Sequence, residues 1–123
     1  MGTASLNRSS TAELIDEFTQ IAIQQGDNLL GGNTESYNRF VDKMRAIESE
    51  LRSRPGDQRS ELMPLLTHPN IAVRWKASVA VLGIFPAPAR QALEAVAKSG
   101  YLPICGHAGM TLHSFDTGFF KPT

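Results

Sequence analysis

The stretch Leu62-Met63-Pro64-Leu65-Leu66-Thr67-His68-Pro69-Asn70-Ile71-Ala72-Val73-Arg74-Trp75-Lys76-Ala77 decides the fold of this chain. Its leucines fall at helical spacing, which predicts a short helix from about Asp57 to Leu66. Pro64 is expected to kink this helix, because the ring removes an amide donor and clashes with the preceding turn. The tight turn His68-Pro69-Asn70 follows. A second helix is predicted from Ile71 to about Phe85, so the stretch forms one antiparallel helix pair.

The apolar pattern of this second helix recurs 31 residues later in the chain. At about 100° per residue, one stripe of the helix consists of Val73, Ala77, Ala80, Val81 and Ile84. The equivalent positions hold Ile104, Ala108, Thr111, Leu112 and Phe115, with the small residue at the same place. This period is close to the unit of solenoids built from helix pairs. We therefore predict a further pair, with helices from Pro86 to Gly100 and from Pro103 to Phe115.

The first stretch resembles a HEAT repeat, which carries a proline in its first helix, a short polar turn, and then Val-Arg followed by alanine three residues later. The matching positions are Pro64, Val73, Arg74 and Ala77. His68 and Asn70 stand where the turn usually carries aspartate, and Cys105 stands where the arginine would recur. The whole chain also resembles a family of short bacterial proteins with this fold and no established activity. The resemblance implies an armadillo-like, right-handed α-α superhelix and a binding surface more often than catalysis.

The N-terminal half is predicted to supply the first helix pair. Ser10 and Glu13 form a capping box that starts a helix ending near Gln25. A glycine-rich loop is expected at 26–33, with Leu29 and Leu30 tucked against the core. The helix predicted at 34–53 is the clearest amphipathic segment. The expected fold is thus all-α, with three stacked antiparallel helix pairs in one domain over 10–118, a flexible tail at 1–9 and a C-terminal tail at 119–123.

Two further expectations concern the packing of the last two pairs. Trp75, Val79 and Leu82 form a second apolar stripe on the helix at 71–85, which predicts that this helix is buried between two layers. In the tail, Phe119 and Phe120 are expected to pack back onto the domain.

Composition excludes several classes of function. Twelve Lys and Arg balance twelve Asp and Glu, so the chain lacks the basic excess typical of proteins that bind nucleic acid. The single cysteine forbids an internal disulfide, which favours a reducing compartment. The polar N-terminus lacks the features of a signal peptide, and no apolar run reaches the roughly 18 residues of a membrane span. We therefore expect a cytoplasmic protein that binds neither nucleic acid nor membrane.

No catalytic, metal or cofactor site is predicted. Cys105, His107 and His113 fall on different sides of one predicted helix, so they do not converge as zinc ligands or as a nucleophile with its base. The polar face of the helix at 34–53 mixes both charge signs with an amide, which suits a protein interface, and its candidate binding residues are Asn38, Arg39, Asp42 and Arg45. Two further candidates are Arg74, as an arginine that could bind a ligand, and Trp75, as an interface residue if it is exposed. For two of them there is a structural alternative, in which Arg74 bonds to turn carbonyls or a carboxylate and Trp75 lies in the core.

The leading functional hypothesis is a protein-interaction module without catalysis, such as an adaptor or an immunity-type protein that binds another protein. The alternative is a small-ligand binder or enzyme of HEAT-like type, using an apolar cleft near Trp75, Cys105 and His107. A third reading is an architectural role, with self-association through the Phe119-Phe120 tail or the loop at Leu29-Leu30.

Overall fold

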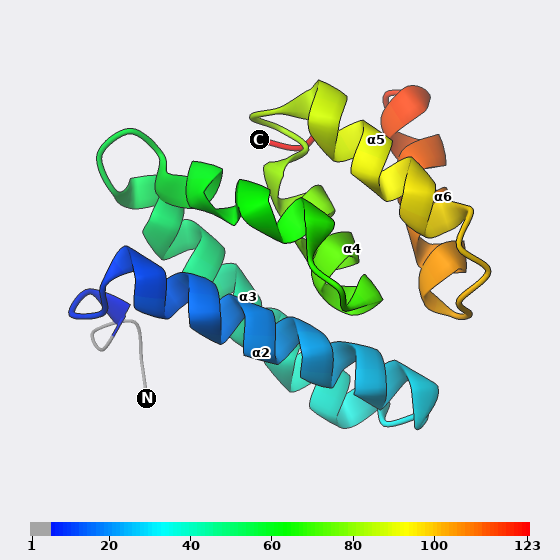
Figure 1. Cartoon of the computed structure of the whole chain (residues 1–123), viewed down its shortest axis with the longest axis horizontal. Helices are drawn as coiled ribbons and strands as arrows, with labels where there is room; N and C mark the ends of the chain where they lie inside the picture. The colour runs from blue at the N-terminus through cyan, green and yellow to red at the C-terminus, as the bar shows by residue number, and fades with distance from the viewer. Residues whose placement is uncertain (1–5) are drawn as a thin grey trace. The chain divides into compact units, whose positions relative to one another are not determined.

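Figure 1 shows the computed structural model of the chain, in which residues 6–123 are described. Those residues form helices and no strand, which confirms the all-α prediction for this part of the chain. The elements are α2 (Thr11–Leu30), α3 (Thr34–Ser53), the 3₁₀ helix η1 (Gln58–Thr67), α4 (Ile71–Val81), α5 (Pro86–Ala97) and α6 (Ile104–Asp116). The chain divides into two compact units, unit 1 (Met1–Leu62) and unit 2 (Met63–Thr123).

Unit 1 is built on the packed pair of α2 and α3 (Figure 1). The predicted capping box is present: Glu13 N–H donates to Ser10 Oγ (3.1 Å), and Ser10 N–H donates to a Glu13 carboxylate oxygen (2.8 Å). The buried residues of the pair fall at helical spacing on both helices: Leu14, Phe18, Ile21, Ala22, Met44, Ile47 and Leu51. One buried stripe on each helix therefore forms the core of this unit.

Helix α2 is longer than predicted, so the expected loop at 26–33 is largely wrong. The helix runs through Gly26, which is buried within it, and ends only at Leu30. Helix propensity at a single glycine is a weak signal that packing overrides. The chain turns instead at Gly32, whose φ of +72° favours glycine. Leu30 is 70% exposed, so the prediction that it tucks against the core is also wrong, whereas Leu29 is half-buried.

The segment around Pro64 forms the 3₁₀ helix η1 where an α-helix with a kink was predicted. A proline inside a helix cannot donate the hydrogen bond that continues an α-helix, and the tighter helix accommodates it in short pieces. After the turn, α4 begins as predicted at Ile71, where Asn70 Oδ1 accepts from the amides of Ala72 (2.9 Å) and Val73 (3.3 Å). It ends at Val81 rather than at Phe85. Phe85 precedes Pro86, and a residue directly before a proline disfavours the helical conformation.

Unit 2 is built from α4, α5 and α6, which pack on one another. The two repeated positions of small residues, Ala77 and Ala108, are both fully buried, as are the preceding Val73 and, nearly so, Ile104. A small residue at each place lets a neighbouring helix approach closely. Two of the five positions that recur after 31 residues are therefore buried on both helices, whereas Thr111, Leu112 and Phe115 are half-buried. Of the second predicted stripe, Trp75 on α4 and Leu82 directly after it are buried, whereas Val79 is half-buried.

The segment after α6, residues 117–123, runs back toward the end of α4 (Figure 1). Phe120 N–H donates to the Ser114 carbonyl (2.9 Å), and the backbone of Pro122 and Thr123 lies against Gly83. The two aromatic residues of this segment differ in burial. Phe120 is half-buried, whereas Phe119 is 91% exposed, so the prediction that both pack back is wrong for Phe119.

Gly83→Ala is expected to displace this C-terminal segment. A Cβ at residue 83 would lie 2.8 Å from the carbonyl carbon of Thr123 and 3.0 Å from that of Pro122, too close for either backbone to remain in place. Hydrogen exchange at the Phe120 amide should accelerate by about tenfold, equivalent to roughly 1.4 kcal/mol of lost local protection. Gly106→Ala is the matched control, because a Cβ there meets nothing within 4 Å. Unchanged protection at Phe120 would contradict this packing.

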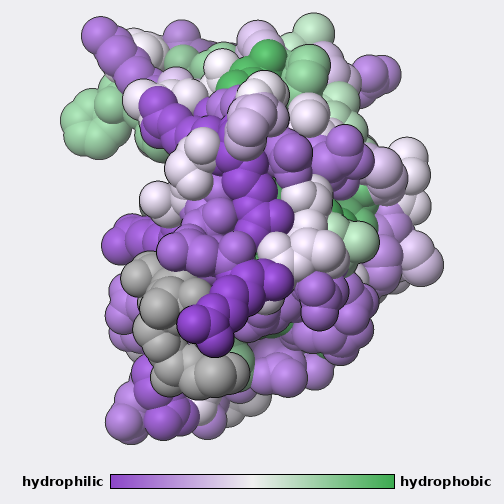
Figure 2. Space-filling model, turned by 90° about the vertical axis from the view of Figure 1, so that its left-hand side faces the viewer, coloured by the Kyte–Doolittle hydropathy of each residue, from purple (hydrophilic) through white to green (hydrophobic). Residues whose placement is uncertain are grey.

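The surface facing the viewer in Figure 2 is mostly hydrophilic, with hydrophobic residues confined to small areas. Among the described residues, no helix is long and apolar enough to cross a membrane.

Candidate functional site

The predicted binding residues of unit 1 lie on the exposed side of α3. Asn38, Arg39, Asp42 and Arg45 are all exposed. Arg39 Nη2 donates to Ser36 Oγ (3.1 Å). The side chains of Asn38, Asp42 and Arg45 make no hydrogen bond or ion pair within the described part of the chain. Their spacing of four and three residues places these three on one face of the helix, where they can meet a partner.

The other two predicted residues lie in unit 2 and are held by intramolecular contacts. Arg74 Nη1 donates to the carbonyls of His68 (2.8 Å) and Pro69 (3.1 Å), which confirms the structural alternative of an arginine that closes the turn. Trp75 is 5% exposed. Its ring stacks on His107, with centroids 5.5 Å apart and planes at 23°, and Lys76 Nζ lies 4.0 Å from the Trp75 ring centroid.

An open groove of about 420 Å³ lies beside this stacked pair. It is lined from α4, α6 and the C-terminal segment by Trp75, Val79, His107, Met110, Thr111, Ser114, Phe119 and Phe120. Met110 is 71% and Phe119 is 91% exposed, so two large apolar side chains stand in solvent at its edge. We call this site the unit 2 groove.

The unit 2 groove corresponds in part to the apolar cleft expected near Trp75, Cys105 and His107. Trp75 and His107 line it, whereas Cys105 does not and is a half-buried free thiol. Met110 was not predicted as a surface feature, whereas the Phe119-Phe120 tail was considered both as packed back and as a surface for self-association. The apolar residue Met110 in an otherwise mixed helix gave no signal of its exposure. No cluster of three or more His, Cys, Asp or Glu that could hold a metal occurs among residues 6–123.

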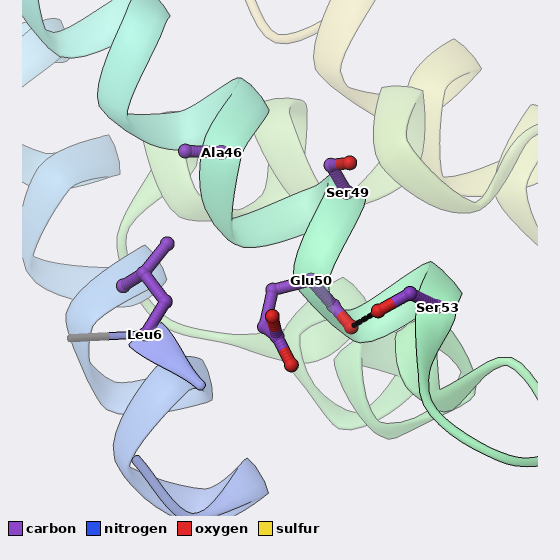
Figure 3. A pocket seen from close by; sticks show the side chains of 5 residues that line it. All are labelled: Leu6, Ala46, Ser49, Glu50 and Ser53. Carbon is purple, nitrogen blue, oxygen red and sulfur yellow. Dashed lines mark hydrogen bonds between the residues drawn. The ribbon is translucent and has the colours of Figure 1, made fainter. Parts of the chain in front are cut away.

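A second, more polar pocket of about 270 Å³ lies in unit 1. Figure 3 shows its lining: Leu6 projects from the segment before α2, and Ala46, Ser49, Glu50 and Ser53 follow one another along α3. Ser53 Oγ donates back to the Glu50 carbonyl (2.8 Å). The wall that Leu6 supplies depends on the position of the N-terminal segment.

Arg54 fixes that segment to the end of α3. Its Nη2 donates to the carbonyls of Ser9 (2.7 Å) and Leu6 (3.0 Å), and its Nε donates to Glu50 Oε2 (2.9 Å). Of the flexible tail predicted at 1–9, residues 1–5 lie outside the described residues. The backbone of residues 6–9 is held by these hydrogen bonds.

Arg54→Ala is expected to release residues 6–9 and to open the unit 1 pocket. Two carbonyls would lose a charged donor, and each such bond contributes about 1.5–3 kcal/mol. The rate of trypsin cleavage after the exposed Arg8, measured by mass spectrometry of the intact chain, should rise by at least about tenfold. Arg45→Ala, which removes an exposed arginine of the same helix, should leave that rate unchanged. Equal rates in the two variants would show that Arg54 does not hold the segment.

The two units carry opposite net charge. Residues 1–62 contain seven Lys and Arg against ten Asp and Glu, whereas residues 63–123 contain five against two. Both acidic side chains of unit 2 are paired with one arginine: Arg90 Nη2 lies 2.6 Å from Asp116 Oδ2, and Arg90 also contacts Glu94. The hydrogen bonds from Arg90 lower the pKa of Asp116. Residues 63–123 thus carry a net charge of +3 (five basic minus two acidic residues), and Arg90 offsets part of the negative charge of the two carboxylates that it contacts.

Comparison with known proteins identifies the family of this fold. The chain is similar to the crystal structure of the protein RPA1889 from Rhodopseudomonas palustris CGA009, with a TM-score of 0.91 and 39% sequence identity, over 96% of this chain and 98% of that chain. No curated protein matches the sequence. The family DUF2019, described as a domain of unknown function, matches residues 12–116. This match spans both units and most of their helices, and the chain therefore belongs to the DUF2019 family.

Proposed function

We propose that this chain is a protein-interaction module without catalysis, built on helix pairs of HEAT-like type. The observation that carries the proposal is the unit 2 groove, where Met110 and Phe119 are exposed beside the buried Trp75. Apolar side chains exposed together and rimmed by polar residues are typical of protein-binding sites. Methionine and aromatic residues are enriched in such interfaces, since they bury a large area on binding.

The repeated helix pattern supports the HEAT-like part of the proposal. In unit 2, α4 and α6 bury equivalent positions 31 residues apart, and Arg74 closes the turn before α4. Folds of this type present surfaces for binding, an argument by analogy. An adaptor or immunity-type protein that binds another protein fits this surface, and so does the mixed-charge face of α3 as a second contact region.

The alternative function is a small-ligand binder, with the same groove as its site. A volume of about 420 Å³ lies within the usual range for ligand pockets. Such pockets, however, enclose most of their ligand, whereas this groove leaves Met110 and Phe119 exposed. The open geometry favours side chains of a partner protein.

Affinity capture from native lysate, read by quantitative mass spectrometry, tests the proposal. The bait proteins are the unaltered chain, Met110→Glu and Arg8→Glu. We expect one stoichiometric partner that Met110→Glu loses by at least about tenfold, because burying a carboxylate against apolar side chains is costly. Arg8→Glu, a charge reversal at an exposed residue outside both contact regions, should retain that partner. If no protein is retained at low or physiological salt, or if a low-mass compound occupies the purified chain instead, the interaction-module proposal is wrong.

A further inference from the structure

The partner of the unit 2 groove can be specified further from the charges around it. The groove lining is mainly apolar, and the two acidic side chains of unit 2 are both paired with Arg90. Lys121 follows the groove residue Phe120 directly and is exposed. Lys76 lies over the ring of Trp75, which also lines the groove. An occupant thus meets apolar side chains in the groove and cationic side chains at its edge.

We propose that the unit 2 groove binds an acidic amphipathic segment of a partner protein, an inference that rests on the proposed interaction function. Apolar side chains at helical spacing would lie against Met110 and Phe119, as in other helix-in-groove complexes. Carboxylates of the partner segment, placed between its apolar side chains, would face the ammonium groups of Lys121 and Lys76. Charge complementarity of this kind selects acidic segments over basic ones, because like charges at an interface are repelled.

The floor of the groove is suited to this role, whereas its rim is adaptable. Trp75 is held by the stacked His107, and the backbone of Phe120 is held by Ser114. Met110 and Phe119 project freely into solvent, and methionine in particular adjusts its shape to different apolar surfaces. A fixed aromatic floor with flexible apolar side chains at its rim fits an inserted side chain better than a rigid cofactor.

The test uses two synthetic peptides of about 14 residues without tryptophan, each with leucine at i, i+3, i+4 and i+7 spacing. One peptide carries glutamate at the positions that leucine does not occupy, and the second peptide carries lysine at those same positions. Because Trp75 is the single tryptophan of the chain, its fluorescence reports occupancy directly. Amide shifts of Met110 and Phe119 in two-dimensional NMR locate the site. Both peptides are titrated against the full chain.

We expect the glutamate peptide to bind with a Kd of tens to hundreds of micromolar, equivalent to about −5 to −6 kcal/mol. The lysine peptide should bind at least about tenfold more weakly. Met110→Glu should lower the affinity for the glutamate peptide by about tenfold or more, and Lys121→Glu should lower it by about threefold to fivefold. Arg8→Glu, at an exposed residue of unit 1, should leave binding unchanged. Both groove positions are exposed, so these variants should fold, as circular dichroism can verify.

Four outcomes would overturn the inference. Equal affinity for the two peptides would contradict the proposed selectivity for acidic segments. No response to about 2 mM glutamate peptide would show that the groove does not bind such a segment. A Trp75 response to neutral phosphatidylcholine vesicles alone would assign the groove to lipid. Sedimentation that shows dimers lost only in Met110→Glu would assign it to a second copy of the chain. If the peptides fail while Met110→Glu still loses a captured partner, the interaction function stands and only this specificity is wrong.

Discussion

Phe18→Ala is expected to lower the free energy of unfolding by about 3–5 kcal/mol, the largest loss among the substitutions considered. Phe18 is fully buried on α2, on the same side of the helix as the equally buried Leu14. Removing the ring deletes buried apolar surface and leaves a cavity, because the surrounding helices relax only partly to fill it. Since small domains are stable by about 5–15 kcal/mol, a loss of this size is a substantial share of the margin. Urea denaturation with linear extrapolation measures the effect.

Phe119→Ala provides the matched control, because it removes the same ring from a position that is 91% exposed. Its free energy of unfolding should change by less than about 0.5 kcal/mol. The contrast tests the core of unit 1 directly. A loss below about 1 kcal/mol at Phe18 would mean that this ring is not buried as described.

Asp57→Ala is expected to lower the free energy of unfolding by about 1–3 kcal/mol at neutral pH. Arg59 is 7% exposed, and its Nε and Nη2 donate to the two carboxylate oxygens of Asp57 at 2.8 Å and 2.6 Å. Alanine would leave this buried guanidinium without those acceptors. It would also strain the backbone, since residue 57 has a φ of +53°, which aspartate and asparagine tolerate better than alanine. Denaturation at pH 7 measures the loss.

The same contact predicts a dependence of stability on pH. The hydrogen bond from Arg59 holds the pKa of the Asp57 carboxyl below its usual value. The folded pKa is depressed, so the stabilisation is fully present above the unfolded value of about 3.9 and is lost as the pH falls through the folded pKa. The free energy of unfolding of the unaltered chain should therefore decline more steeply below about pH 4 than that of Asp57→Asn.

Asparagine is the right comparison for this titration, because it tolerates the positive φ and retains one acceptor for Arg59 but has no charge to lose. Other carboxyls with a lowered pKa, those of Glu13 and Asp116, titrate in the same direction in both proteins. Their contribution cancels in the difference between the two pH profiles. Parallel profiles below pH 4 would show that the Asp57–Arg59 pair does not contribute to stability.

Local features of the sequence determined much of the helical framework. The start of α2 followed from the capping box of Ser10 and Glu13, and the bounds of α3 agree with the amphipathic segment predicted at 34–53. The equivalence of Ala77 and Ala108 followed from a shared period. These signals lie within a few residues of the element they specify, so they can be read without knowing the fold. The exposed position of Asn38, Asp42 and Arg45 followed in the same way.

The tertiary structure decided the features that bring distant segments together. Packing carried α2 through Gly26 to Leu30, against a local signal for a loop. One side of the unit 2 groove is formed by the C-terminal segment. There the backbone of Pro122 and Thr123 lies against Gly83 and the Phe120 amide donates to the Ser114 carbonyl, while Phe119 stays exposed. No periodicity encodes such a contact, since it depends on a glycine about 40 residues away that has no side chain to exclude the returning backbone. The sequence by itself therefore determined the helical class and most of the buried faces, whereas only the tertiary structure decided where α2 and α4 end and which apolar side chains remain exposed.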